Sequence, residues 1–155
     1  MKFFVGAIML TCALTGVVAA CPQELAPNAP QDKLVRSTGE QKFELAIAPY
    51  VKKARETLPD AKKKFRRGLR KGEILFVTTR IHANGTFEQI FVRVKSWEGD
   101  SIQGTLASDI AIVPNHHIGE ALNCKESEVV DWTISKPDGS EEGNFVGKFL
   151  DTYKP

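Results

Sequence analysis

The sequence predicts an α+β domain, with two N-terminal helices followed by a curved, mainly antiparallel sheet of five to six strands or a partly open barrel. Apolar residues recur at helical spacing between residues 49 and 69. From residue 73 they recur in short β-branched runs that alternate with polar residues. Turn sequences such as "HANG" and "KPDGS" separate these runs. The chain has 155 residues, 42% of them hydrophobic, which suits one domain.

The first twenty residues have the pattern of a secretory signal peptide. Lys2 precedes an apolar run that ends in small residues at Ala20. "VAAC" at 18–21 also resembles a bacterial lipobox, in which Cys21 is lipidated and becomes the new N-terminus; ordinary cleavage before Cys21 fits the same residues. Residues 21–41 are rich in Pro, Ala and Gln, as expected of a tether. We therefore expect an exported protein of the bacterial cell envelope, lipid-anchored and facing the periplasm, or else a soluble periplasmic or secreted one.

The domain itself is expected to cover residues 42–155 and to begin with helices. Residues 42–49 fit a short strand or an early helical turn. Pro49 is placed at the start of a first helix that ends at Leu58, because proline is tolerated in the first turn and disrupts a helix interior. Pro59 is expected to interrupt the chain. Asp60 then caps a second helix whose apolar face ends near Leu69.

Short strands are expected to follow these helices. Residues 73–81 and 86–97 flank the Asn-Gly turn and predict a hairpin. Further strands are expected at 101–107, 110–113, 127–134 and 144–150. The last two would form a core hairpin with an acidic turn that faces water. Its inner side would be filled by Trp132, Ile134, Phe145 and Phe149, with Val130 on the same side.

The three cysteines have different expected fates. Cys12 lies in the predicted signal peptide and is lost with it. If Cys21 is lipidated, Cys124 is a lone thiol that packs as a small apolar side chain. If Cys21 is not lipidated, a Cys21–Cys124 disulfide can form in an oxidising compartment.

Charge is distributed unevenly along the chain. Residues 51–71 contain ten Lys and Arg against two acidic residues, a net charge of +8, whereas residues 72–155 carry a net charge of −6. The basic stretch is the best candidate for an anionic-partner surface, either an envelope protein or an anionic lipid surface. An exported protein meets few nucleic acids, so none is expected. The candidate residues are Lys62, Lys63, Lys64, Arg66, Arg67, Arg70 and Lys71.

Catalytic and metal sites are not indicated by any motif. His116 and His117 are adjacent, so in an extended chain their side chains point to opposite sides and chelate one metal ion poorly. The sequence contains no spacing typical of a zinc site. Five acidic residues could supply paired carboxylates for acid–base chemistry: Asp109, Asp131, Asp138, Glu141 and Glu142. Each also fits a structural role, with Asp131 pointing outward beside an inward Trp132. No catalytic residue, metal or cofactor is therefore assigned.

Two further stretches resemble a known family. "FEQIFVRVKSWEGDSIQGTLASDI" and "SEVVDWTISKPDGSEEGNFVGKFLDTY", together with "KARETLP", are similar to motifs of the YegJ-like bacterial family, a domain of unknown function. The resemblance covers about residues 45–153. It implies an α+β fold and no established activity, substrate or cofactor. The residues that carry its hairpin signature, and to which it gives a structural role, are Asp131, Trp132, Pro137, Asp138, Gly139, Gly143 and Asn144.

These observations favour an envelope lipoprotein with a non-catalytic binding or accessory domain. Two alternatives stay open. One is a hydrolase with a carboxylate and histidine site, using Asp109, Asp131 and a histidine. The other is an immunity-type regulator that binds a partner protein. The oligomeric state is not predicted by the sequence.

Overall fold

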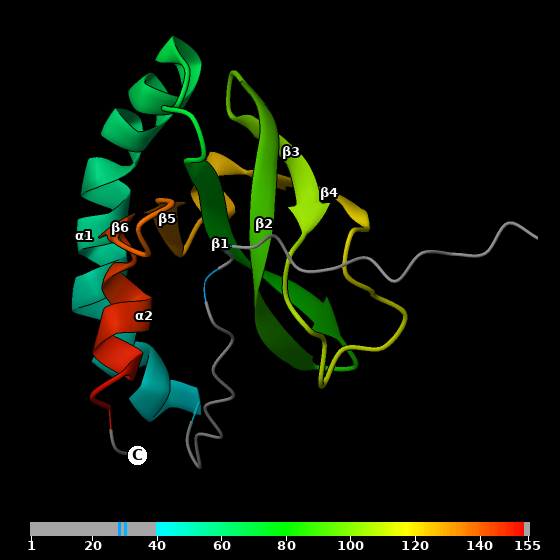
Figure 1. Cartoon of the computed structure of the whole chain (residues 1–155). Coiled ribbons are helices and arrows are strands. Elements are labelled where there is room, and N and C mark those ends of the chain that lie inside the picture. The colour runs from blue at the N-terminus through cyan, green and yellow to red at the C-terminus, as the bar shows by residue number, and fades with distance from the viewer. Residues whose placement is uncertain (1–27, 29, 31–39, 154–155) are drawn as a thin grey trace, which may run out of the picture.

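One long helix lies across one face of an antiparallel sheet (Figure 1). The computed structural model describes residues 28, 30 and 40–153. The predicted signal peptide, Cys12, Cys21 and most of the predicted tether lie outside the described residues. The elements are α1 (Glu40–Arg67), β1 (Ile74–Ala83), β2 (Thr86–Glu98), β3 (Ser101–Leu106), β4 (Ala121–Lys125), the 3₁₀ turn η1 (Glu126–Glu128), β5 (Asp131–Ser135), β6 (Glu141–Gly143) and α2 (Phe145–Leu150).

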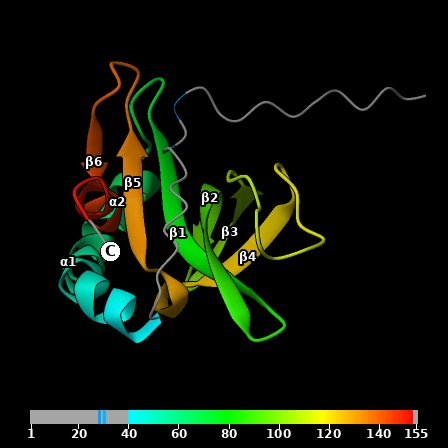
Figure 2. The same ribbon diagram turned by 90° about the horizontal axis from the view of Figure 1, so that it is seen from below.

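The six strands form one open sheet in the order β4-β3-β2-β1-β5-β6, with every neighbouring pair antiparallel. This confirms the expected class and strand number. The first four strands form a meander, in which each strand pairs with the next one along the chain. Strand β5 then returns to the far side of β1, so that β1 lies between β2 and β5 (Figure 2).

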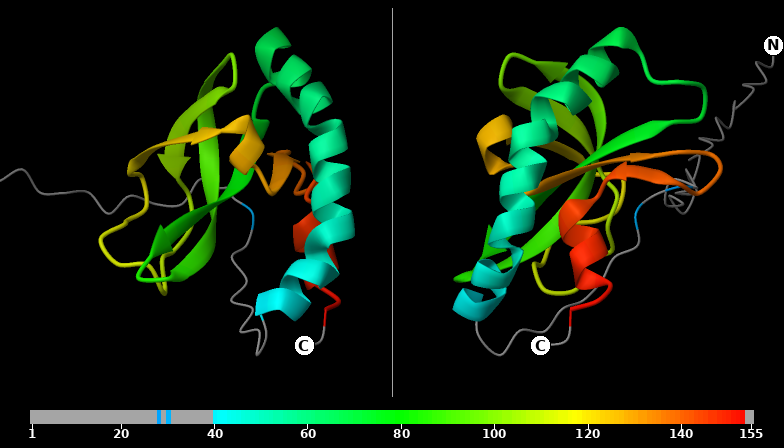
Figure 3. Two further views of the ribbon diagram at one scale, coloured as in Figure 1. Left: turned by 180° about the vertical axis from the view of Figure 1, so that it is seen from behind. Right: turned by 90° about the vertical axis from the view of Figure 1, so that its left-hand side faces the viewer.

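The expectation of two N-terminal helices is wrong, because α1 runs through both prolines as one 28-residue helix. Pro49 and Pro59 each remove the hydrogen bond to the carbonyl four residues earlier, on Leu45 and Arg55. All four residues are exposed, so water can solvate these carbonyls. The opposite face keeps its contacts with the sheet (Figure 3), and this packing outweighs the loss of two hydrogen bonds.

The turn chemistry predicted for the β1–β2 hairpin is confirmed. Asn84 and Gly85 both have positive φ, 51° and 76°, as a type I′ turn requires. The "KPDGS" turn is also present, since Gly139 N donates to Lys136 O and the Asp138 carboxylate accepts from Ser140 N.

Two strand predictions are wrong in the second half of the chain, and one strand was missed. Residues 110–113 form a loop, because the Glu88 carboxylate accepts the N–H groups of Ala111, Ile112 and Val113 that a strand would use in a ladder. Residues 144–150 contain the short helix α2 instead of the expected strand. The strand that pairs with β5 is the three-residue β6, which lies just before this helix. Strand β4 was not expected from the sequence.

Two apolar clusters hold the fold together. The main core lies between α1 and the sheet and includes Ala54, Leu58, Val77, Trp132 and Ile134, all nearly inaccessible to water. A second cluster joins the N-terminal half of α1 to α2 and contains Phe43, Ile47, Tyr50, Val130, Val146 and Phe149. The strand pattern predicts that Val130 and Phe149 lie on the same core face as Trp132. This prediction is wrong, because both residues belong to the second cluster and Trp132 belongs to the main core. No helix among the described residues combines the length and apolarity needed to cross a membrane.

Candidate functional site

The predicted basic stretch divides into two groups in the structure. Lys62 and Lys64 turn back onto the domain. Lys62 is paired with Glu126 and lies over the ring of Trp97, at 5.4 Å from its centroid, and Lys64 is paired with Glu142 on β6. These two lysines neutralise carboxylates of the sheet side and fix α1 against it. They are therefore not available to a partner in the way that the sequence pattern had suggested.

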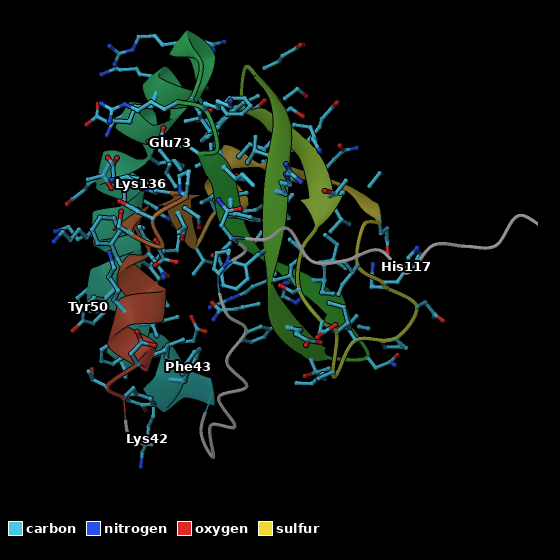
Figure 4. All side chains as sticks on the ribbon, viewed as in Figure 1. Lys42, Phe43, Tyr50, Glu73, His117 and Lys136 are labelled. Atoms are coloured by element: carbon cyan, nitrogen blue, oxygen red, sulfur yellow. The ribbon has the colours of Figure 1, made fainter. Side chains whose placement is uncertain are left out.

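The remaining five basic residues project from the C-terminal end of α1 and from the segment that follows it. We call this set the basic tip: Lys63, Arg66, Arg67, Arg70 and Lys71. All five are exposed, and side-chain nitrogens extend outward at this end in Figure 4. Lys63 pairs with Asp60 at 3.1 Å, whereas no ion pair joins the other four to any residue in the described part of the chain.

Part of this charge has a local structural role. Basic side chains in the last turn of a helix interact favourably with the helix dipole, which accounts for Arg66 and Arg67 at the end of α1. Arg70 and Lys71 lie beyond the helix, where this interaction is weak. The dipole therefore does not explain the whole tip.

The signature hairpin supports the segment that carries the tip. A Cβ atom added at Gly72 would lie 2.5 Å from Pro137 Cγ, so the α1–β1 connection packs directly on the β5–β6 turn. Gly72 has a φ of 84°, a backbone conformation that suits glycine. Asp138 and Gly139 shape that turn. The residues that the family resemblance marked thus position Arg70 and Lys71, two and one residues before Gly72.

The N-terminal segment reaches the domain at the same place. Asn28 Nδ2 donates to Gly72 O at 3.2 Å and to Ser135 O at 3.4 Å, and Pro30 is buried. These contacts span more than forty residues of sequence. No motif in residues 21–41 predicts that Asn28 binds the domain. The two carbonyls that it binds, on Gly72 and Ser135, are brought side by side only by the fold.

Acidic residues border the tip on both sides. The β2–β3 turn contains the exposed Glu98 and Asp100, and its Gly99 carbonyl accepts a hydrogen bond from Lys62. On the other side, the β5–β6 turn carries the exposed Asp138, and the Glu73 carboxylate accepts from Arg70 N at 2.9 Å. The positive tip is therefore flanked by carboxylates on both sides.

Asp131 is a buried carboxyl group whose pKa is strongly raised. Only 1% of the residue is exposed, contrary to the outward position expected for it. Its Oδ1 accepts from Trp132 N at 2.8 Å and its Oδ2 from Val146 N at 2.6 Å, at the start of α2. Burial raises the pKa of Asp131 to about 6, although the backbone N–H groups oppose this shift. The carboxylate thus holds α2 on the end of β5.

The histidines form no metal site in the described part of the chain. His116 Nδ1 lies 3.0 Å from Glu120 Oε1, and His117 Nδ1 lies 3.8 Å from the other oxygen of Glu120. Their loop lies far from α1 (Figure 4, where His117 is labelled). No group of three potential metal ligands occurs among the described residues. The two histidines share one carboxylate, an arrangement that the adjacent positions had not predicted.

Residues 47–151 match a bacterial family described as "Uncharacterized protein conserved in bacteria (DUF2314)". The chain belongs to this family. The match extends from α1 to the C-terminal end of α2 and so contains the basic tip and the signature hairpin. No curated protein and no solved structure matches the chain.

Three further residues that the hairpin resemblance marked, Trp132, Gly143 and Asn144, have structural contacts. Trp132 Nε1 donates to Ala54 O and Thr57 Oγ1, which joins β5 to the middle of α1. Gly143 has a φ of 79° and touches Trp132, where an added Cβ would lie 2.2 Å from the Trp132 carbonyl. Asn144 also has positive φ and donates to Glu141. Cys124 is free and buried, and burial raises its pKa to about 11.

Proposed function

We propose that the chain is an envelope lipoprotein, anchored through Cys21, whose DUF2314 domain is a non-catalytic accessory domain that binds an anionic partner with the basic tip. In this proposal residues 1–20 are the signal peptide, the tether starts at residue 21 and ends before α1 begins at Glu40, and the domain faces the periplasm. The hairpin motifs also support a YegJ-like member of the family. The observation that carries the proposal is the exposure of four cations without an ion-pair partner among the described residues, beside carboxylates that two other lysines neutralise.

The contacts of the candidate acid–base residues favour binding over hydrolysis. The Asp131 carboxylate is occupied by backbone N–H groups of β5 and α2. His116 is paired with Glu120 in the loop before β4. A hydrolase site would need these groups to converge on one substrate, whereas each already has a local partner.

The anchor is tested by the intact mass and membrane fractionation of the native protein, wild type against Cys21→Ser. We expect a chain that starts at residue 21 with acyl chains, and loss of membrane association in the variant. A chain that starts at residue 21 without lipid would instead support a soluble periplasmic or secreted protein.

The tip is tested separately with the soluble Cys21→Ser protein on heparin, used as a plain polyanion. We expect Arg66→Glu with Arg67→Glu to lower the salt concentration needed for elution. The matched control is Lys42→Glu with Lys52→Glu, which makes the same change in net charge at exposed positions of α1, roughly 20 Å or more along the helix from Arg66 at 1.5 Å per residue. Equal shifts in both variants would mean that net charge alone governs retention, and the tip would lose its assigned role.

A further inference from the structure

We propose that the anionic partner is the lipid headgroup layer of the membrane that holds the anchor, so that the domain stands on the bilayer with the C-terminal end of α1 toward it. This inference rests on the proposed function, because it takes Cys21 as the anchored residue. It adds the chemistry of the partner and an orientation of the domain.

The length of the tether places the tip near the anchor. Asn28 follows Cys21 by seven residues. Because an extended chain spans at most about 3.6 Å per residue, Asn28 can lie no more than roughly 25 Å from the anchored residue. Asn28 is bonded to Gly72 O, and Gly72 directly follows Lys71 of the basic tip. The anchor and the tip are therefore held at the same end of the domain.

The other end of α1 cannot reach the headgroups at the same time when the helix stands upright. A helix of 28 residues is roughly 42 Å long at 1.5 Å per residue. Lys42, near the start of α1, lies at the opposite end from the tip in Figure 4. Interactions between exposed charges are screened beyond about 10 Å at ordinary salt concentrations, so only charges close to the bilayer contribute. A tip-down orientation brings the basic end into that range.

The composition of the tip fits headgroup phosphates better than a protein surface. Three of its five residues are arginines, whose planar guanidinium groups bind phosphate oxygens in a bidentate manner. Protein interfaces take most of their affinity from a few residues, often Trp, Tyr and Arg, that are packed in desolvated pockets near the centre, so an arginine there needs apolar or aromatic neighbours that exclude water. Among the described residues the exposed large hydrophobics are Leu45 and Ile112, in the early turns of α1 and in the loop before β4. Neither belongs to the tip, so it lacks such a centre.

Exposed acidic residues beside the tip weaken its attraction to the bilayer. Glu98 and Asp100 in the β2–β3 turn would be repelled by an anionic surface. Replacing both by their amides is then expected to strengthen binding more than the same change at two exposed carboxylates far from the tip.

The experiment places a fluorescent label at Lys71→Cys or at Lys42→Cys in the acylated protein and reconstitutes it in vesicles. Cys124 is buried and free, and Cys21 is consumed by acylation, so the introduced thiol is the reactive one. The quencher is a nitroxide on the lipid headgroup. We expect strong quenching at residue 71, weak quenching at residue 42, and a smaller difference between the two sites when phosphatidylglycerol is replaced by phosphatidylcholine, because the tether alone then holds this end of the domain near the bilayer. Equal quenching at both sites, or a difference that ignores lipid charge, would overturn the proposal.

A second arm measures binding of the soluble Cys21→Ser protein to phosphatidylglycerol vesicles. Arg66→Glu with Arg67→Glu should weaken binding by at least about 30-fold, because the attraction of two basic residues to an anionic surface is lost and the repulsion of two glutamates is added. Lys42→Glu with Lys52→Glu should weaken it far less. If the tip binds heparin but neither arm shows lipid dependence, this inference fails and the proposed function stands. If the native protein carries no acyl chain, the proposed function fails first, and the intact mass shows that independently.

Discussion

Ionisation of Asp131 is predicted to lower the stability of the fold, because its carboxyl group is buried. Its pKa is raised from 3.8 to about 6 in the folded state. The folded chain therefore binds a proton more tightly than the unfolded chain does. The contribution of this group to stability is greatest below pH 3.8, falls as the pH rises to 6, and is constant above that. A shift of 2.2 pKa units at 1.36 kcal/mol each corresponds to about 3 kcal/mol.

The perturbation is Asp131→Asn, which removes the titration and keeps one oxygen to accept from Val146 N. Urea unfolding of both proteins at about pH 4 and about pH 7.5 gives four free energies of unfolding. Between these values the wild type should lose about 2 kcal/mol more than the variant does. All other titrating groups are common to both proteins, so their contributions cancel in this double difference.

A control carboxyl group with the opposite shift is Asp138. It is fully exposed, and its hydrogen bonds from Ser140 hold its pKa below the usual value. Asp138→Asn should therefore give a double difference of the opposite sign and small size, because both its folded and its unfolded pKa lie below about pH 4 and most of its titration occurs below that pH. If Asp131→Asn gives a value near zero, or one with the sign of Asp138, the hydrogen bonds from Trp132 N and Val146 N outweigh burial and the reasoning is refuted.

Three further changes test other parts of the fold. Gly143→Ala should lower the free energy of unfolding in urea by at least about 3 kcal/mol, because the residue has positive φ and an added Cβ would overlap a backbone carbonyl. Gly68→Ala, which has positive φ but open space around it, should lower it by about 1 kcal/mol. Similar losses in both variants would contradict the overlap. The Cys124 thiol should react with a thiol reagent only after unfolding, because burial raises its pKa to about 11; rapid labelling of the folded protein would contradict this. Glu88→Ala should speed amide exchange in residues 111–113, whose N–H groups its carboxylate accepts, and unchanged exchange would show that the loop is held by other contacts.

The parts of the fold that the sequence predicted are those with local signals. Alternation and the Asn-Gly turn fixed β1 and β2, because strand period and turn chemistry act over a few residues. Pro49 and Pro59 led to the wrong prediction of two helices. The free-energy cost of a proline inside a helix depends on whether water can reach the carbonyl that loses its hydrogen bond, and this depends on the tertiary structure. Strand β4 has almost no signal of its own: its five residues alternate only in burial, against β3.

The candidate site was predictable in outline and not in detail. The run of lysines and arginines located the basic end of α1, but pairing of Lys62 and Lys64 depends on Glu126 and Glu142, more than sixty residues away. The burial of Asp131 likewise depends on α2, which the pattern had presented as a strand. Asn28 gives no sequence signal because its partners are backbone carbonyls, and any residue has those.

The place of β5 beside β1 has a consequence for how the chain is completed during synthesis. Strands β1 to β4 can pair in order as they emerge, but β1 keeps one open edge until residues 131–135 are made. The core under α1 is also incomplete until then, because Trp132 and Ile134 come from β5 and Trp132 Nε1 donates to Ala54 O. A nascent chain therefore has an unpaired strand edge and an incomplete core until β5 is made, and truncations before residue 131 should aggregate rather than fold.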